Sequence, residues 1–279
     1  MMGKWDALVK GALLHDIGKV VYRANQGTDA HSKRGAAFIE PYFSDMGLKQ
    51  SITHCLKYHH GKELSAAQLK NDDYAYIVYE ADNIAAAVDR RDLDEGESTA
   101  TQKFDKELPL QSIFRVFGGK TSTLPLQYYL RGLDVSGHFN YPESDKTIRA
   151  SSDKYKALYD VFQQQPIDNM SVNELLRIYE DTVSYMPSST ATDQANDISL
   201  YMHSKITAAV AHSMVHYFEE QGITNYKEYC YQNSKKFRNM PAFRLISGDI
   251  SGIQNFIYTI PSKGALKSLR GRSFYLEIL

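Results

Sequence analysis

The sequence predicts a mostly α-helical protein that changes to an α+β pattern after Pro241. Two observations support this fold class. Apolar residues recur at spacings of three and four from residue 4 to about 90, and again from 154 to 220. The run FRLISGDI after Pro241 is instead typical of a strand that ends in a turn. The fractions of hydrophobic and charged residues, 43% and 23%, are ordinary for a globular chain and exclude a disordered or fibrous protein.

Helices are expected where this periodicity runs between breaks formed by Gly, Pro or Asp. In chain order they cover residues 4–22, 31–44, 50–60, 72–91, 154–164, 171–184 and 197–220. Gly61 is placed to close the third as a C-terminal cap, and Asn71-Asp72 precedes the fourth. Residues 92–154 predict loops with short helical or extended pieces. The run PSSTATDQAN at 187–196 predicts a polar linker or loop, because small polar residues cannot supply a core. We expect a strand over 244–250 and a helix after it.

The charge distribution divides the chain into two parts. The 279 residues carry 32 basic and 33 acidic side chains, a net charge of −1. Residues 230–279 contain eight basic and two acidic residues, a net charge of +6, which leaves −7 for the preceding residues. No apolar run approaches the roughly 18 residues that would cross a bilayer, so we expect no membrane partner. The two cysteines, Cys55 and Cys230, indicate a reducing cytosol rather than a disulfide framework.

Several titratable residues fall on the apolar faces of the predicted helices. Asp82 follows Val78 by four residues and precedes Ala85 by three, on the buried face of its helix. A buried carboxylate must be paired, hydrogen-bonded or bound to a metal. His15 and Asp16 fall on the apolar face of the first helix, and the stripe of the third continues onto His59-His60. Any one of these residues alone is compatible with a core histidine or a capping aspartate. As a set they predict a divalent metal held by imidazoles and carboxylates.

The order of these residues resembles the HD superfamily of metal-dependent phosphohydrolases. The segment HDIGK at 15–19 is followed by His31, by His59-His60 and by Ala81-Asp82. The resemblance implies that His15, Asp16 and Asp82 hold a first metal, with Asp16 bridging to a second. It implies that His31, His59 and His60 hold this second metal. His15 and Asp16 would then be catalytic, together with Lys19, which would hold a phosphate oxygen.

HD folds usually begin with a histidine on a helix that precedes the HD pair, and here only fourteen residues precede His15. The helix SLYMHSKITAAVAHSM resembles this first helix, and His203 adjoins its apolar stripe. We therefore expect a circularly permuted HD domain in which His203 completes the metal site. The alternative is that His203, His212 and His216 are ordinary helix residues.

The C-terminal segment resembles one particular protein family more closely. Residues 244–258 (RLISGDISGIQNFIY) and 262–277 (SKGALKSLRGRSFYLE) closely resemble the start of the first palm domain in the large subunit of type III-A CRISPR–Cas (Csm) effector complexes. The HDIGK motif, the HS-x-x-GA pattern at 31–36 and the HHG motif at 59–61 fit the same family. The resemblance implies an HD nuclease domain at 1–110, a helical connector at 111–240 and a truncated ferredoxin-like palm at 241–279. Residues 197–220 of the connector would complete the HD domain.

The same resemblance implies what the protein does. It implies a cytoplasmic nuclease for single-stranded DNA, acting with guide RNA and other type III-A subunits and activated by target RNA. A longer subunit would also make cyclic oligoadenylate from ATP in a second palm with a Gly-Gly-Asp-Asp motif, a motif that this sequence lacks. The basic run is expected to face phosphates or, alternatively, to form a solvated helix face. It comprises Lys263, Lys267, Arg270 and Arg272.

Two other functions fit an HD domain. One is a phosphodiesterase or phosphohydrolase that acts on small nucleotides, and the other is a non-catalytic scaffold for assembly. The residues after His59-His60 are Gly-Lys-Glu-Leu rather than an acidic residue and a Gly-Tyr-Pro run, which disfavours the cyclic-dinucleotide branch. For the metal we expect one or two ions of Mn²⁺ or Ni²⁺, with Mg²⁺ and Co²⁺ as further candidates, because nitrogen and oxygen ligands accept several metals.

Overall fold

The computed structural model describes most of the chain, in two compact units. It describes residues 4–25, 29–89, 104–114, 126–133, 140–192, 195–247, 251–258 and 264–278. The chain divides into a large unit, Met1–Ala242, and a small unit, Phe243–Leu279. The boundary expected at residue 110 falls inside the large unit, and the division into HD domain and connector stays a prediction.

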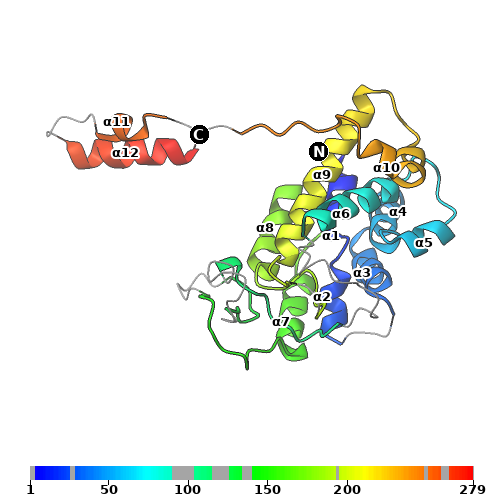
Figure 1. Ribbon diagram of the computed structural model, residues 1–279, viewed down its shortest axis with the longest axis horizontal. Coiled ribbons are helices and arrows are strands. Elements are labelled where there is room, and N and C mark those ends of the chain that lie inside the picture. Colours follow the sequence, from blue (N-terminus) through cyan, green and yellow to red (C-terminus); the bar gives the residue numbers. More distant parts are fainter. Residues whose placement is uncertain are drawn as a thin grey trace. The chain divides into compact units, whose positions relative to one another are not determined.

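The large unit is built from helices, as the sequence predicts (Figure 1). They are α1 (Asp6–Leu14), α2 (Gly18–Arg23), α3 (His31–Ile39), η1 (Glu40–Tyr42), α4 (Met46–Lys57), α5 (Gly61–Ala66), α6 (Tyr74–Asp89), α7 (Ser152–Gln163), α8 (Val172–Val183), α9 (Leu200–Glu220), η3 (Glu228–Gln232) and α10 (Ser234–Phe237). In the described parts of the loops, extended pairing is limited to isolated bridges such as Gln111 with Gln127. No helix in the described ranges has the length and apolar character needed to cross a membrane.

Helix α1 lies at the centre of the packing. It contacts α4 and α9, and also α6 and α8, while α6 packs along α9. Its side chains Leu8, Ala12, Leu13 and Leu14 are at most 1% exposed. Burial of such apolar side chains is the main stabilising contribution to this arrangement. The packing brings α6 and α9, which are more than 100 residues apart in the sequence, into contact with each other and with α1.

The ends of several helices differ from the predictions. The helix expected over 4–22 is broken at 15–17, and the helix expected over 31–44 becomes a 3₁₀ turn at Glu40–Tyr42, where Pro41 has no N–H to donate. Asp45 begins α4 earlier than expected by accepting a hydrogen bond from the Leu48 N–H at 2.7 Å. The prediction that Gly61 caps this helix was wrong, because α4 ends at Lys57 and Gly61 begins α5.

The segment 187–191 differs from the expected polar linker in its burial. It is a loop, but Ser188, Thr190 and Ala191 are at most 8% exposed. Ser188 N–H donates to Ile198 O at 2.9 Å and Asp105 N–H donates to Thr190 O at 2.9 Å. Small polar residues can be buried here because backbone N–H and C=O groups of the loop form hydrogen bonds with neighbouring segments.

The small unit contains α11 (Ile253–Tyr258) and α12 (Ala265–Ile278). The strand expected over 244–250 is not formed at 244–247, which has no regular structure, and 248–250 lies outside the described residues. Within this unit the Arg272 guanidinium donates to Phe256 O and lies 5.1 Å from the centre of the Phe256 ring.

Candidate metal centre

The break between α1 and α2 positions the first two site residues. In the turn the Ile17 N–H donates to Leu14 O and the Lys19 N–H donates to Asp16 O, both at 2.9 Å, so three-residue spacing replaces the four-residue spacing of an α-helix. His15 and Asp16 lie in this turn and are 0% and 2% exposed. The turn therefore holds an imidazole and a carboxylate inside the unit at adjacent positions.

Steric constraints require a glycine at position 18, in the HDIGK motif. A Cβ atom on Gly18 would lie 1.8 Å from the carbonyl oxygen of His31 and 2.8 Å from the Gly35 nitrogen. Only glycine lets α2 approach α3 this closely. The approach brings His31 Nε2 to 3.4 Å from Asp16 Oδ1. The motif thus fixes two neighbouring candidate ligands and the path of the helix that carries a third candidate, His31.

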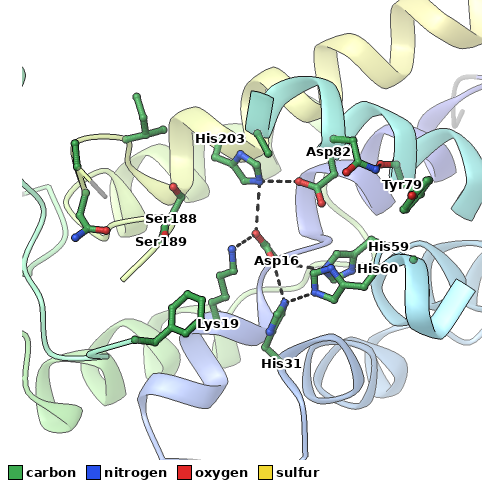
Figure 2. A pocket seen from close by; sticks show the side chains of 17 residues that line it. Asp16, Lys19, His31, His59, His60, Tyr79, Asp82, Ser188, Ser189 and His203 are labelled. Carbon is green, nitrogen blue, oxygen red and sulfur yellow. Dashed lines mark hydrogen bonds and ion pairs between the residues drawn. The ribbon is translucent and has the colours of Figure 1, made fainter. Parts of the chain in front are cut away.

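Two buried imidazoles are oriented by backbone carbonyls. His15 Nδ1 donates to Ala12 O and His59 Nδ1 donates to Leu56 O, both at 2.7 Å. Within the described structure neither Nε2 has a hydrogen-bond partner, and His59 lines the cleft shown in Figure 2. A carbonyl that holds one imidazole nitrogen while the other stays available is the usual arrangement of a metal-binding histidine.

Asp16 lies between the imidazoles (Figure 2). Its Oδ1 is 3.4 Å from His31 Nε2 and 3.6 Å from His59 Nε2. Its Oδ2 is 3.4 Å from His15 Nε2 and 3.6 Å from His203 Nε2. Each carboxylate oxygen therefore faces a different pair of histidines, which is the arrangement needed for a carboxylate that bridges two metal ions.

Helices α6 and α9 supply the opposite wall of the cleft. His203 Nε2 lies 3.1 Å from Asp82 Oδ1, which is also 3.6 Å from His15 Nε2. His203 is 5% exposed. The structure therefore places His203 of the long helix α9 beside the residues of the HD motif, whereas His212 and His216 on the same helix are exposed and lie 3.1 Å apart.

The donor atoms form two groups. His31, His59 and His60 form one, and His15, Asp16 and His203 form the other, with the ligand atoms of each group within 4.8 Å of one another. His60 Nε2 and His31 Nε2 are 2.9 Å apart. The buried atoms without a hydrogen-bond partner, together with this mixture of imidazole and carboxylate donors, fit a divalent metal ion.

The charges of the cleft are strongly coupled. Burial by itself lowers the pKa of His15, but Asp16 and Asp82 outweigh burial and raise it to about 10. Burial raises the pKa of Asp16, yet Lys19 and His15 hold it well below its usual value. The pKa of His59 is well below its usual value, because burial and its neighbours His60 and His15 disfavour the cation. The cleft thus holds an ionised carboxylate beside a neutral imidazole, both suited to bind a cation.

The cleft has a volume of about 340 Å³ and includes residues that sequence reasoning missed. Phe104, Ser188 and Ser189 line it. No motif marks them, because they lie in loops that only the tertiary structure brings to α2. Lys19 also lines the cleft, with Nζ 2.5 Å from Asp16 Oδ2.

The basic residues predicted for phosphate contact belong to the other unit. Lys267, Arg270 and Arg272 lie on α12, and Lys263 lies outside the described residues. Their role stays a prediction.

Comparison with known proteins shows which families this chain resembles. The family described as HD domain matches residues 3–87, and the family described as Csm1 subunit domain B matches residues 242–279. A Cas10/Csm1 single-strand-specific deoxyribonuclease (subtype III-A) from Enterococcus italicus is 42% identical over 100% of this chain. Its counterpart from Mycobacterium tuberculosis is 36% identical over 96% of this chain. The chain spans 38% and 36% of the lengths of these two relatives.

The fold is similar to solved structures of the same subunit. The crystal structure of Csm1 from T. onnurineus matches with a TM-score of 0.70 and 28% identity, over 100% of this chain and 35% of that one. Csm1 in the apo Csm1–Csm4 cassette matches with a TM-score of 0.67 and 27% identity, over 99% and 35%. The predicted mostly helical HD fold is confirmed, and the chain belongs to the Cas10/Csm1 family of subtype III-A CRISPR systems.

Proposed function

We propose that the large unit is a metal-dependent nuclease that hydrolyses single-stranded DNA. The observation that carries this proposal is the convergence of three buried atoms that have no hydrogen-bond partner in the described structure: His15 Nε2, His59 Nε2 and Asp16 Oδ1. Leaving such atoms unpaired costs about 1–3 kcal/mol each, so a fold keeps them where a ligand satisfies them. The relatives named as single-strand-specific deoxyribonucleases support the choice of substrate.

We propose that the cleft takes two divalent ions. His15, Asp16, Asp82 and His203 would hold one ion, and His31, His59 and His60 the other, with Asp16 shared. The donors are nitrogen and oxygen atoms without thiolates, which suits Mn²⁺ or Ni²⁺, and also Co²⁺ or Mg²⁺. Bound ions would polarise the scissile phosphate and lower the pKa of water, which is the chemistry that phosphodiester hydrolysis requires.

The protein itself orients the proposed metal-binding side chains. The carbonyls of Ala12 and Leu56 fix the rings of His15 and His59 before any ligand arrives, so little conformational entropy is lost on binding. Asp16 keeps its negative charge because Lys19 and His15 lower its pKa. Preorganised charge of this kind needs no rearrangement during the reaction.

Lys19 is the side chain proposed to contact the substrate. Its ammonium pairs with Asp16 but is 23% exposed at the cleft, and an ammonium has three donors. One donor can remain on Asp16 while another binds a non-bridging phosphate oxygen. Lys19 would thereby bind the phosphate that the metal-binding residues receive.

We propose that the chain acts in the cytoplasm as part of a guide-RNA-directed type III-A complex with other Csm subunits. Target RNA would activate it. Csm1–Csm4 cassettes have been solved in complex with ATP and with cA4, which supports assembly with a second Csm subunit and nucleotide binding by the complex. Synthesis of cyclic oligoadenylate would belong to a palm with a Gly-Gly-Asp-Asp motif, which this sequence does not contain.

The test is a cleavage assay with the purified chain. Labelled single-stranded DNA, duplex DNA, RNA and cyclic dinucleotides are incubated with Mn²⁺, Ni²⁺, Mg²⁺ or EDTA. We expect cleavage of single-stranded DNA that requires the metal and is abolished by His15→Ala with Asp16→Ala. Cleavage restricted to small nucleotides would instead indicate a phosphohydrolase, and metal binding without turnover, also in the assembled complex, would indicate a scaffold.

A further inference from the structure

A second hollow opens beside the metal cleft. It has a volume of about 730 Å³. It shares Lys19, His31, Phe104, Ser188 and Ser189 with the cleft, so the two form one continuous groove. Each volume lies within the roughly 300–1,000 Å³ typical of small-molecule sites, and together they exceed the space that one phosphate needs.

The loop 187–191, which forms one wall of this second hollow, is held in place by hydrogen bonds. Arg23, only 4% exposed, donates from Nη1 to Pro187 O at 2.6 Å and from Nη2 to Ser188 O at 3.3 Å. Asp105 N–H donates to Thr190 O at 2.9 Å on the other side of the same loop. The loop 187–191 is therefore fixed to α2 and to the segment that carries Phe104.

Two aromatic rings line this hollow and are unusually exposed. The side chains of Phe104 and Tyr22 are 65% and 45% exposed. Tyr22 has the Arg34 guanidinium 4.7 Å from its ring centre, and this cation holds the ring in place. Exposed aromatic rings beside a site for phosphate chemistry are suited to stack on nucleic acid bases.

The charge of this hollow is positive. Lys19 and Lys106 line it, and the carboxylate of Asp105 is neutralised by Arg149 at 2.7 Å. Lys106 donates to Asn25 Oδ1, which leaves two further donors on its ammonium. Positive charge together with aromatic rings is the combination that binds single strands without sequence preference.

We propose that this hollow binds the nucleotides next to the scissile phosphate, with Phe104 and Tyr22 stacking on bases and Lys106 contacting a backbone phosphate. The inference rests on the proposed nuclease function and gives it a physical basis for strand selectivity. A duplex keeps its bases stacked on one another, so the faces that Phe104 and Tyr22 would contact are accessible only in a single strand.

The experiment measures binding separately from cleavage. Fluorescence anisotropy with a labelled DNA strand of about ten nucleotides, in EDTA, gives the dissociation constant of the full chain without turnover. We expect Phe104→Leu and Tyr22→Leu each to weaken single-strand binding about tenfold, and Phe104→Tyr to retain it because the ring is kept. Lys106→Gln should reduce the slope of log Kd against log salt by about 0.7.

The control is Tyr141→Ala, which removes an aromatic side chain that is 70% exposed and lines neither part of the groove. Circular dichroism verifies that each variant is folded. Unchanged binding in Phe104→Leu and Tyr22→Leu would overturn the proposed groove, even if the unmodified chain cleaves DNA. Binding that depends on Phe104 without any metal-dependent cleavage would instead contradict the nuclease function alone.

Discussion

Two buried carboxylates in this protein have opposite surroundings. Glu80 on α6 is 0% exposed and is matched by Arg238, whose Nε and Nη2 donate to its two oxygens at 2.6 and 2.8 Å. Asp16 is equally buried, but its Oδ1 has no hydrogen-bond partner in the described structure and faces imidazole nitrogens at 3.4 and 3.6 Å. A paired carboxylate joins two elements, whereas an incompletely paired one indicates a site for a ligand.

The pKa values of Glu80 and of the cleft carboxylate Asp82 are shifted in opposite directions. Burial raises the pKa of Glu80 above its usual value of 4.5, and Arg238 only partly offsets this effect. The pKa of Asp82, on the same helix, is held well below its usual value, because the nearby imidazoles of His15 and His203 outweigh burial. Four predictions test the contrast between the metal centre and the Glu80–Arg238 pair.

The largest expected effect is that of Asp16→Asn. The change keeps the size of the side chain but removes the charge that both ligand groups share, so we expect cleavage to fall at least about 1,000-fold. Metal titration by calorimetry should show loss of both ions. If Asp16→Asn retained either full activity or both ions, Asp16 would not be the shared ligand.

His203→Ala tests the long-range contact between α9 and the HD motif. Loss of a ligand from the buried group should reduce cleavage about 100-fold and lower the affinity for one of the two metal ions. His212→Ala is the matched control, because this histidine lies on the same helix but is exposed. Full metal occupancy and activity in His203→Ala would show that His203 is an ordinary helix residue.

His60→Ala should have a smaller effect. His60 is half-buried and faces His31, so an ion held by His60 would be more accessible to solvent. We expect cleavage to fall about tenfold, with recovery at higher metal concentration. His54→Ala controls for a lost imidazole, since His54 pairs with Asp73 at 2.7 Å. Activity that does not respond to added metal would argue against a ligand role.

The smallest effect on catalysis is expected for Arg238→Met, which tests the paired carboxylate. It leaves Glu80 buried without its cation, so we expect the free energy of unfolding to fall by about 2–3 kcal/mol at neutral pH, with cleavage unchanged while the protein is folded. Because the folded pKa of Glu80 is raised, its contribution to stability is present at low pH and is lost as the pH rises.

Urea unfolding at several pH values measures this change. The loss in Arg238→Met should shrink as the pH falls towards 4.5, the usual pKa of a glutamate. Adding Glu80→Gln should restore most of the stability, because the double variant has no buried charge. Lys235→Met is the control, because Lys235 lies on the short helix α10 that directly precedes Arg238. A loss that does not depend on pH would show that Arg238 contributes by packing alone.

Much of the fold could be predicted because it depends on local patterns. The periodicity of residues 72–91 and 197–220 predicted α6 and α9 to within a few residues. The break at 15–17 could not be predicted, since HDI is compatible with a continuous helix and the turn is stabilised by packing. Gly61 was misassigned for a similar reason, because a glycine after a helix can close it or begin the next one.

The sequence alone determined which residues are candidates for the metal site: the HDIGK motif, His31, His59-His60 and Asp82 are identified by order and spacing. The tertiary structure decided how they meet. It placed His203 at 3.1 Å from Asp82, turned Asp16 so that each oxygen faces two histidines, and buried the loop 187–191 as a wall of the groove. Helical periodicity fixes the face on which a side chain lies, but only packing between distant helices fixes which faces come together.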